Sequence, residues 1–314
     1  MIRLTAPLVP ALSLMLACTS AGAAGSEAPS ADPQAPTEQA PTEQAPTAQA
    51  EQAREQQSPP NQAPAEPAPG ELAQAAPSGG ALGDPPSEGD PELAAATAWQ
   101  TVLTNYVTAD GGFRYEALMA SAADMANLDT FVAWAAGVST TGWSRESELA
   151  FLINAYNANT VKSVVDLWPV ESVLSEEGFF DGRQIVVAGM TLTLNGLEND
   201  QIRARFGEPR IHFLVNCASV GCPWLINERV HGDNLEALLE RQATSYVRRT
   251  SAFDRETNTA TVSAIFDWFA GDFEAGGGVR AFLAARLPDG DAAFVTDEST
   301  TIAFAEYDWN LNGR

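Results

Sequence analysis

The apolar and polar positions of the chain change character near residue 93, where a helical repeat begins. Four stretches carry such a repeat: residues 91–107, 113–119, 124–136 and 146–168. Apolar side chains cover all but a narrow strip of the last and longest stretch, which stops just before Pro169. We therefore expect a central, mostly buried helix over Glu146 to Trp168.

Strand patterns are short and are scattered among further helices. Gln184 to Leu194 reads as a hairpin around Ala188 and Gly189. Further strands are predicted at 211–216, 259–262 and 301–304, and further helices at 195–206, 234–248, 264–273 and 278–287. Since no regular strand–helix alternation is present, the fold class is expected to be α+β. We predict a single mixed domain of several helices around a small, mainly antiparallel sheet.

The beginning of the chain reads as an export signal. Met1 to Cys18 has one arginine and then an apolar stretch that is too short to span a bilayer. Its end, Leu-Met-Leu-Ala-Cys, resembles the bacterial lipobox, in which the cysteine carries the lipid. Cys18 is therefore a candidate lipidation site, and an ordinary signal peptide cut after Ala23 is the alternative.

A tract from Thr19 to Glu92 follows, rich in Ala, Pro, Gln and Glu, with the unit QAPTE repeated. It cannot bury enough apolar surface to offset its chain entropy, so we expect a disordered linker before a globular domain at 93–314. The chain has a formal net charge of −24. Because acidic surfaces repel phosphates, nucleic acid is not an expected partner.

These features together predict an exported, lipid-anchored protein of the cell envelope, facing the periplasm or held at the outer membrane. Its expected membrane contact is the N-terminal lipid. The patterns indicate no cofactor, and they do not identify a protein or small-molecule partner.

The chemistry of the domain is concentrated in HFLVNCASVGCP, residues 212–223. His212 beside Cys217 or Cys222 is typical of a thiol enzyme, because an imidazole can take the thiol proton. The two cysteines could instead form a disulfide across a short turn, or stay inert and reduced. Together with His231, these three residues could supply four zinc ligands. The spacing of the four residues matches no known zinc module, so we predict no metal site.

Polar residues elsewhere could join this site. Asn154 and Asn157 lie on an apolar face of the long helix, so they either bridge to neighbouring loops or line the site. Lys162 is placed for an ion pair with Asp166 one turn away. The acidic candidates for a third catalytic member are Asp267, Glu198 and Asp308, with Glu198 also expected as a helix-capping partner of Asn195.

Five ordered blocks resemble the domain-of-unknown-function family 547: FLINAYNANTVKSVVDLWPVESV, LTLNGLENDQI, PRIHFLVNCASVGCPWL, SAIFDWFAGDF and YDWNLN. The resemblance extends over residues 93–314. It implies that the family pattern includes Asn154, Asn157, His212, Cys217, Cys222 and Asp267.

Two functions are compatible with these residues. The first is thiol-dependent acyl transfer or amide hydrolysis, with a cysteine nucleophile, His212 as base, and Asp267 or an asparagine orienting it. The second is a non-catalytic binding or scaffolding module whose cysteine loop is clipped by a disulfide.

Overall fold

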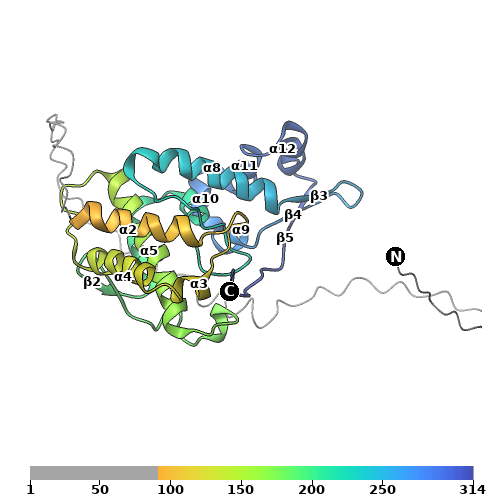
Figure 1. Ribbon diagram of the computed structural model, residues 1–314. Helices are drawn as coiled ribbons and strands as arrows, with labels where there is room; N and C mark the ends of the chain where they lie inside the picture. Colours follow the sequence, from red (N-terminus) through yellow and green to blue (C-terminus); the bar gives the residue numbers. More distant parts are fainter. Residues whose placement is uncertain (1–90, 314) are drawn as a thin grey trace, which may run out of the picture. The chain divides into compact units, whose positions relative to one another are not determined.

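The structure is a computed structural model that describes residues 91–313. The predicted signal peptide, the candidate lipidation site and nearly all of the expected linker lie outside these residues. The described part contains mainly helices, with strands in two small sheets (Figure 1). Its α-helices are α2 (Pro91–Tyr106), α3 (Tyr115–Met119), α4 (Ala122–Gly137), α5 (Arg145–Leu167), α6 (Leu194–Gly196), α7 (Ala204–Phe206), α8 (Gly232–Thr250), α9 (Ile265–Trp268), α10 (Ala270–Phe273), α11 (Gly278–Ala284) and α12 (Asp289–Thr296).

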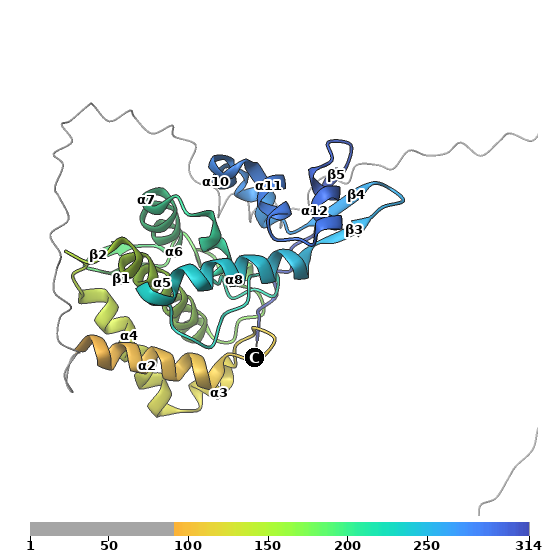
Figure 2. The same cartoon turned by 90° about the horizontal axis from the view of Figure 1, so that it is seen from above.

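Helix α5 is the centre of the larger core, as the sequence predicts. It begins where the Ser144 side chain accepts a hydrogen bond from the Ser147 backbone, and it ends ahead of Pro169. Residues 149–161 of the helix are buried without interruption. Helix α4 packs on α5, and α2 packs on α4 (Figure 2). The rings of Trp99 and Phe131 stack between α2 and α4 with centroids 5.5 Å apart.

The strands form two separate sheets. Strands β1 (Ile185–Val187) and β2 (Met190–Leu192) pair as the predicted antiparallel hairpin. Ala188 and Gly189 form its turn with φ of 50° and 76°, the conformation that a tight hairpin requires. In the other sheet, β4 (Thr259–Val262) pairs antiparallel with β3 (Ala252–Asp254) and parallel with β5 (Thr301–Phe304). The α+β class and the mainly antiparallel pairing are confirmed.

A second hydrophobic cluster lies beside the first and is rich in phenylalanine. It joins the C-terminal half of α8 to β4 and to helices α9–α12. Phe213 belongs to this cluster, whereas its neighbours Ile211 and Leu214 belong to the larger one. The segment that carries His212 is therefore held between two cores.

The predicted strand at 211–216 is wrong. Pro209–Phe213 form a 3-10 helix, because Pro209 favours a helix start and the Glu208 side chain caps the turn by accepting from the Arg210 backbone. The capping prediction for Asn195 is also wrong, since the Thr193 side chain caps α6 and the chain continues as a π-helix over Leu197–Arg203. The sequence patterns also missed β3 and α12.

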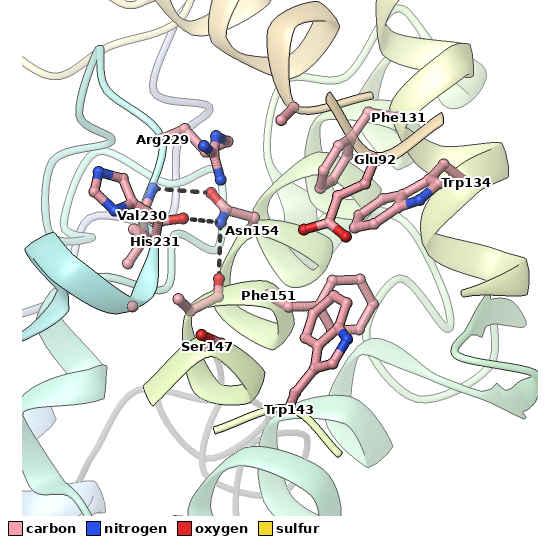
Figure 3. A pocket seen from close by; sticks show the side chains of 13 residues that line it. Glu92, Phe131, Trp134, Trp143, Ser147, Phe151, Asn154, Arg229, Val230 and His231 are labelled. Atoms are coloured by element: carbon pink, nitrogen blue, oxygen red, sulfur yellow. Dashed lines mark hydrogen bonds between the residues drawn. The ribbon is translucent and has the colours of Figure 1, made fainter. Parts of the chain in front are cut away.

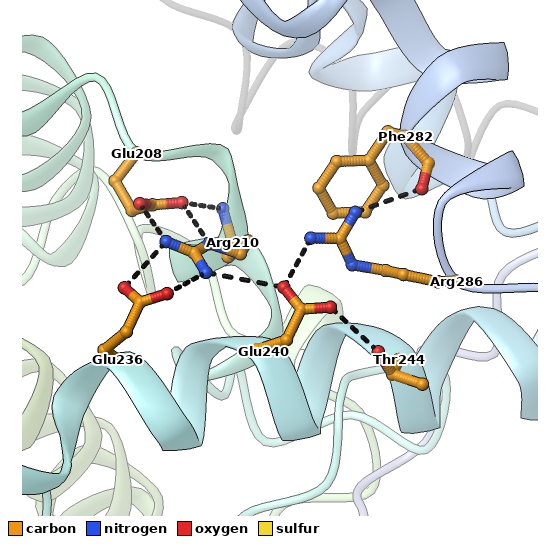
Figure 4. A network of polar contacts seen from close by, with 7 residues as sticks. All are labelled: Glu208, Arg210, Glu236, Glu240, Thr244, Phe282 and Arg286. Carbon is orange, nitrogen blue, oxygen red and sulfur yellow. Dashed lines mark hydrogen bonds and ion pairs between the residues drawn. The ribbon is translucent and has the colours of Figure 1, made fainter.

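An ion-pair network fixes this 3-10 helix to α8 (Figure 4). The Arg210 guanidinium contacts Glu208 at 2.8 Å and Glu236 at 2.7 Å. Glu240 contacts Arg210 at 3.4 Å and Arg286 at 2.7 Å, which extends the network towards α11. The network explains why a sequence with strand character remains helical.

Asn154 joins three parts of the larger core through its buried side chain. Its Oδ1 accepts from Trp99 Nε1 (3.1 Å) and from the Val230 backbone (3.2 Å). Its Nδ2 donates to the carbonyl oxygens of Val230 (2.6 Å) and Ala150 (2.7 Å). Asn154 thus performs the bridging role considered for it, linking α2, α5 and the segment before α8.

No helix between residues 91 and 313 is long and apolar enough to cross a membrane.

We predict that Asn154→Ala destabilises the protein by about 3–5 kcal/mol, because it leaves several buried donors and acceptors without partners. The control is Asn159→Ala on the same helix, where the buried amide donates only to the Ala155 carbonyl (2.8 Å) among the described contacts. Its expected cost is about 1 kcal/mol. Urea unfolding under reducing conditions measures both, and equal losses would contradict the bridging role.

Candidate active site

The loop from Cys217 to Cys222 is clamped by a segment far along the chain. The backbone amides of Val220 and Gly221 donate to the carbonyls of Asn310 (2.9 Å) and Asp308 (2.8 Å). The amide of Asn312 donates back to the Ala218 carbonyl (2.9 Å). These bonds pair two amides and one carbonyl of the loop with the distant segment, so a stretch without regular secondary structure has a defined conformation.

Two asparagines shape the beginning of the loop. Asn157 on α5 accepts from the Asn216 amide (2.8 Å) and donates to the Leu214 carbonyl (2.9 Å). The Asn216 side chain accepts from the Ala218 amide (3.0 Å) and donates to the Pro223 carbonyl (2.7 Å). Ala218 is held at φ 65°, which is unfavourable for a residue with a Cβ. Asn157 therefore positions the cysteine loop through its backbone.

The two cysteines lie side by side at the ends of this loop and are not bonded to each other. Their Sγ atoms are 2.9 Å apart, and both residues are buried. Cys217 Sγ also contacts Ser219 Oγ at 3.0 Å and the Tyr307 hydroxyl at 3.4 Å. The Cys217 backbone amide donates to Cys222 Sγ (2.9 Å).

These contacts separate the acidities of the two thiols. Burial alone would raise the pKa of Cys217, but hydrogen bonds from Cys222, Ser219 and Tyr307 outweigh it and lower this pKa to about 7. Burial and the neighbouring Cys217 raise the pKa of Cys222 well above its usual value. Burial also raises the pKa of Tyr307, so its hydroxyl stays protonated and can donate. Cys217 is therefore the more acidic thiol of the pair.

His212 is buried and is oriented by a hydrogen bond to a carboxylate. Its Nε2 lies 2.7 Å from Asp272 Oδ2, and its ring stacks on Phe269 with centroids 4.1 Å apart. Arg203 binds Asp272 with both Nε (2.7 Å) and a terminal nitrogen (2.9 Å). The same guanidinium lies 4.6 Å from the Phe269 ring centroid, on which His212 also packs.

This arrangement selects the histidine tautomer. Burial opposes ionisation of Asp272, but the hydrogen bonds from His212 and Arg203 depress its pKa well below the usual range. An ionised carboxylate can only accept, so Nε2 must carry the proton. Nδ1, which is 4.0 Å from Glu198 Oε1, then keeps its lone pair in neutral His212 and can act as a base.

A small cavity brings these groups together. It has a volume of about 30 Å³, and its lining includes His212, Cys217, Cys222 and Glu198 with the aromatic residues Tyr156, Trp268, Phe269 and Tyr307. This volume suits one or two water molecules. The cavity can therefore hold a proton-carrying water or one small reacting group of a larger molecule.

The other predicted residues lie apart from this cavity lining. His231 precedes α8, where its backbone amide donates to Asn234 Oδ1 (2.7 Å), and its side chain lines a different pocket. Asp267 and Asp308 do not line the cavity. Lys162 forms the predicted ion pair with Asp166. Residues 91–313 contain no group of three or more His, Cys, Asp or Glu side chains placed to hold a metal ion.

Sequence reasoning missed Asp272, Tyr307 and Arg203. Asp272 is only five positions after Asp267 in the same aromatic segment. No periodicity distinguishes the two acids, because the segment is divided into the short helices α9 and α10. The YDWNLN block did mark the segment containing Tyr307, but nothing in its pattern indicated contact with a cysteine.

Residues 140–247 match the family described as "Protein of unknown function, DUF547". The match supports a DUF547 domain in this part of the chain. It includes the cysteine loop, His212, Glu198, Asn154 and Asn157, whereas Asp272 and Tyr307 lie beyond it. No curated protein and no solved structure matches the chain.

The lowered pKa of Cys217 predicts the pH profile of its alkylation. Only the thiolate reacts, so the iodoacetamide rate should be half-maximal near pH 7 and fall about tenfold per unit at lower pH. Cys222 should react only at higher pH, because its pKa is raised. Peptide mapping by mass spectrometry, with the protein fully reduced, measures each rate.

A matched pair of variants tests the cause of this shift. Tyr307→Phe removes a donor to Cys217 and should move the midpoint to higher pH. Tyr106→Phe, whose hydroxyl instead donates to Asp124 (2.7 Å), should leave the midpoint unchanged. If Cys222 is alkylated before Cys217, Cys217 is not the more acidic thiol. If the pH midpoint of Cys217 alkylation is unchanged in Tyr307→Phe, the Tyr307 hydroxyl does not lower the pKa of Cys217.

Proposed function

We propose that this domain is a thiol-dependent acyl transferase or amide hydrolase with Cys217 as its nucleophile. The observation that carries the proposal is the cavity shared by Cys217 and His212, with His212 held in one tautomer by Asp272. A cysteine, a base and an acid that orients the base form the usual arrangement for covalent acyl chemistry.

In the proposed reaction, Cys217 Sγ attacks the substrate carbonyl carbon. His212 accepts the thiol proton at Nδ1, directly or through a water in the cavity, and returns it to the leaving nitrogen or oxygen as the carbon–heteroatom bond breaks. Water or a second substrate then attacks the thioester, and its proton returns through His212. Asp272 stabilises the imidazolium during both steps.

The other residues that line the cavity, and its size, bear on how this reaction would proceed. The Tyr307 hydroxyl, which keeps its proton, can donate to the sulfur or to an oxyanion that forms beside it. Tyr156 and Glu198 line the cavity together with His212, and burial raises the pKa of Tyr156 well above its usual value. The cavity is too small for a whole substrate, so the substrate must present only its reacting group there.

A second function is favoured by the short distance between the sulfurs. With Sγ atoms 2.9 Å apart, Cys217 and Cys222 need little movement to form a disulfide at about 2.05 Å. A bridged loop would make the domain a non-catalytic binding or scaffolding module. The two functions differ in whether Cys217 is available as a thiolate.

Acylation by p-nitrophenyl acetate tests the leading function, with TCEP as the reductant. Wild-type protein should release p-nitrophenol and gain one acetyl group on Cys217, and Cys217→Ser should lose both. Cys222→Ser, which keeps a donor beside Cys217, should still be acylated. Asp272→Asn should slow acylation by about 10²–10⁴-fold, since the imidazole loses its orienting carboxylate.

Further variants and conditions discriminate between the alternatives. Asp267→Asn tests the other acid of the aromatic segment, and a larger loss there than in Asp272→Asn would contradict the role of Asp272. Two results together would favour the binding module. The first is a Cys217–Cys222 disulfide in protein isolated without reductant, and the second is the absence of acylation after the disulfide is reduced with TCEP.

We propose, in addition, that the domain is exported and anchored in the cell envelope by a lipid on Cys18. Incorporation of labelled fatty acid into the full chain should be lost in Cys18→Ser, because the substitution removes the acceptor thiol. The control Thr19→Ser keeps Cys18 and should incorporate label normally. Equal labelling of Cys18→Ser and the wild type would exclude the lipid.

A further inference from the structure

A larger pocket, of about 270 Å³, lies away from the cysteines (Figure 3). Its lining comes from α2, α4, the connection between α4 and α5, α5 and the segment that leads into α8, and it does not include His212, Cys217 or Cys222. The volume is just below the roughly 300 Å³ at which ligand pockets usually begin. The pocket therefore suits a small organic molecule.

One side of this pocket is an aromatic wall. The rings of Trp134 and Trp143 are stacked with centroids 6.4 Å apart, and both meet Phe151 edge-on, at 5.6 Å and 5.5 Å. Since these rings pack against one another, no cation fits between them as in an aromatic cage. They offer instead a continuous apolar surface to a planar or branched group.

Arg229 lies on the opposite side of the pocket from this wall (Figure 3). Among residues 91–313, the Arg229 guanidinium has no acceptor within hydrogen-bonding or ion-pairing distance, although the residue is partly buried. Burial lowers the pKa of Arg229, and the charge of Glu92 on the pocket rim opposes this. A half-buried guanidinium without an acceptor is poised to bind one from a ligand.

The backbone beneath Arg229 is held in place by three other side chains. The Arg229 amide donates to Gln100 Oε1 (2.8 Å), and its carbonyl accepts from Asn234 Nδ2 (3.0 Å). Asn154 bonds both backbone groups of the next residue, Val230. The backbone of the arginine is thus fixed before any ligand arrives, which reduces part of the entropy cost of binding.

We propose that this pocket binds a small organic monocarboxylate with an aromatic or branched apolar body. The carboxylate would pair with Arg229, and the body would lie on Trp134, Trp143 and Phe151. A single carboxylate fits better than a phosphate, because one arginine faces the pocket, Glu92 lies on its rim, and the chain carries a net charge of −24. The proposal does not depend on the chemistry of Cys217.

Binding of phenylacetate to the full chain tests this site, with phenylacetamide as its uncharged analogue. Tryptophan fluorescence and calorimetry should show saturable binding of phenylacetate with a Kd of about 5 mM or tighter, which a ten-atom ligand reaches at ordinary efficiency. Phenylacetamide should bind at least about tenfold more weakly, because it cannot form the charged pair.

Three variants locate the interaction. Arg229→Gln should weaken phenylacetate binding about tenfold and leave phenylacetamide binding unchanged. Glu92→Gln, at an exposed position, should tighten phenylacetate binding severalfold by removing a like charge. Trp143→Ala should weaken both ligands. Circular dichroism and thermal unfolding check that each variant is folded.

The proposal is overturned if phenylacetate shows no saturable binding at concentrations up to about 10 mM. This limit is about twice the Kd expected for a ligand of its size. The proposal is also overturned if the amide binds as tightly as the acid. The comparison of acid with amide and the Glu92→Gln variant keep the test valid even if Arg229→Gln does not fold.

Discussion

The candidate active site depends on the hydrogen bonds that Asn157 makes from the middle of α5. Because its amide binds the backbone of Leu214 and Asn216, the most buried helix of the domain fixes where the cysteine loop begins. Asn216 then sets the turn at Ala218. A buried amide without these partners would be costly, so the helix and the loop stabilise each other. The placement of Cys217 is thus tied to the core itself.

Asn154, one turn earlier on α5, has the same kind of role on another part of the protein. It binds both backbone groups of Val230, next to Arg229 in the larger pocket. Three residues apart, the two side chains are neighbours on one face of the helix, and they bind two different loops that pack there. Neither residue needs to touch a reacting atom to matter for a site, since each one acts through the backbone that it holds.

The sequence predicted the elements whose pattern is local and strong. The α5 repeat, the hairpin at Ala188 and the strands at 259–262 and 301–304 all follow from periodicity and turn residues. It failed at 211–216, where alternating apolar residues indicated a strand. There, Pro209 and the ion pairs of Arg210 with α8 override the local preference, and such distant contacts leave no periodic signal.

The same limit applies to the site. The cysteines, His212 and Glu198 could be identified as candidates from one short motif and one helix. Their partners could not, because Asp272 is 60 residues from His212 and Tyr307 is 90 residues from Cys217. Only packing of the two cores brings these residues together.

The clamp by residues 307–312 has a consequence for the order of assembly during synthesis. The cysteine loop cannot acquire its final conformation until a segment 90 residues further along has been made. At about 5–20 residues per second, this interval lasts roughly 5–18 s. During that time both thiols lack the contacts that differentiate them, so the distinct acidities of Cys217 and Cys222 arise only once the C-terminal segment has been made.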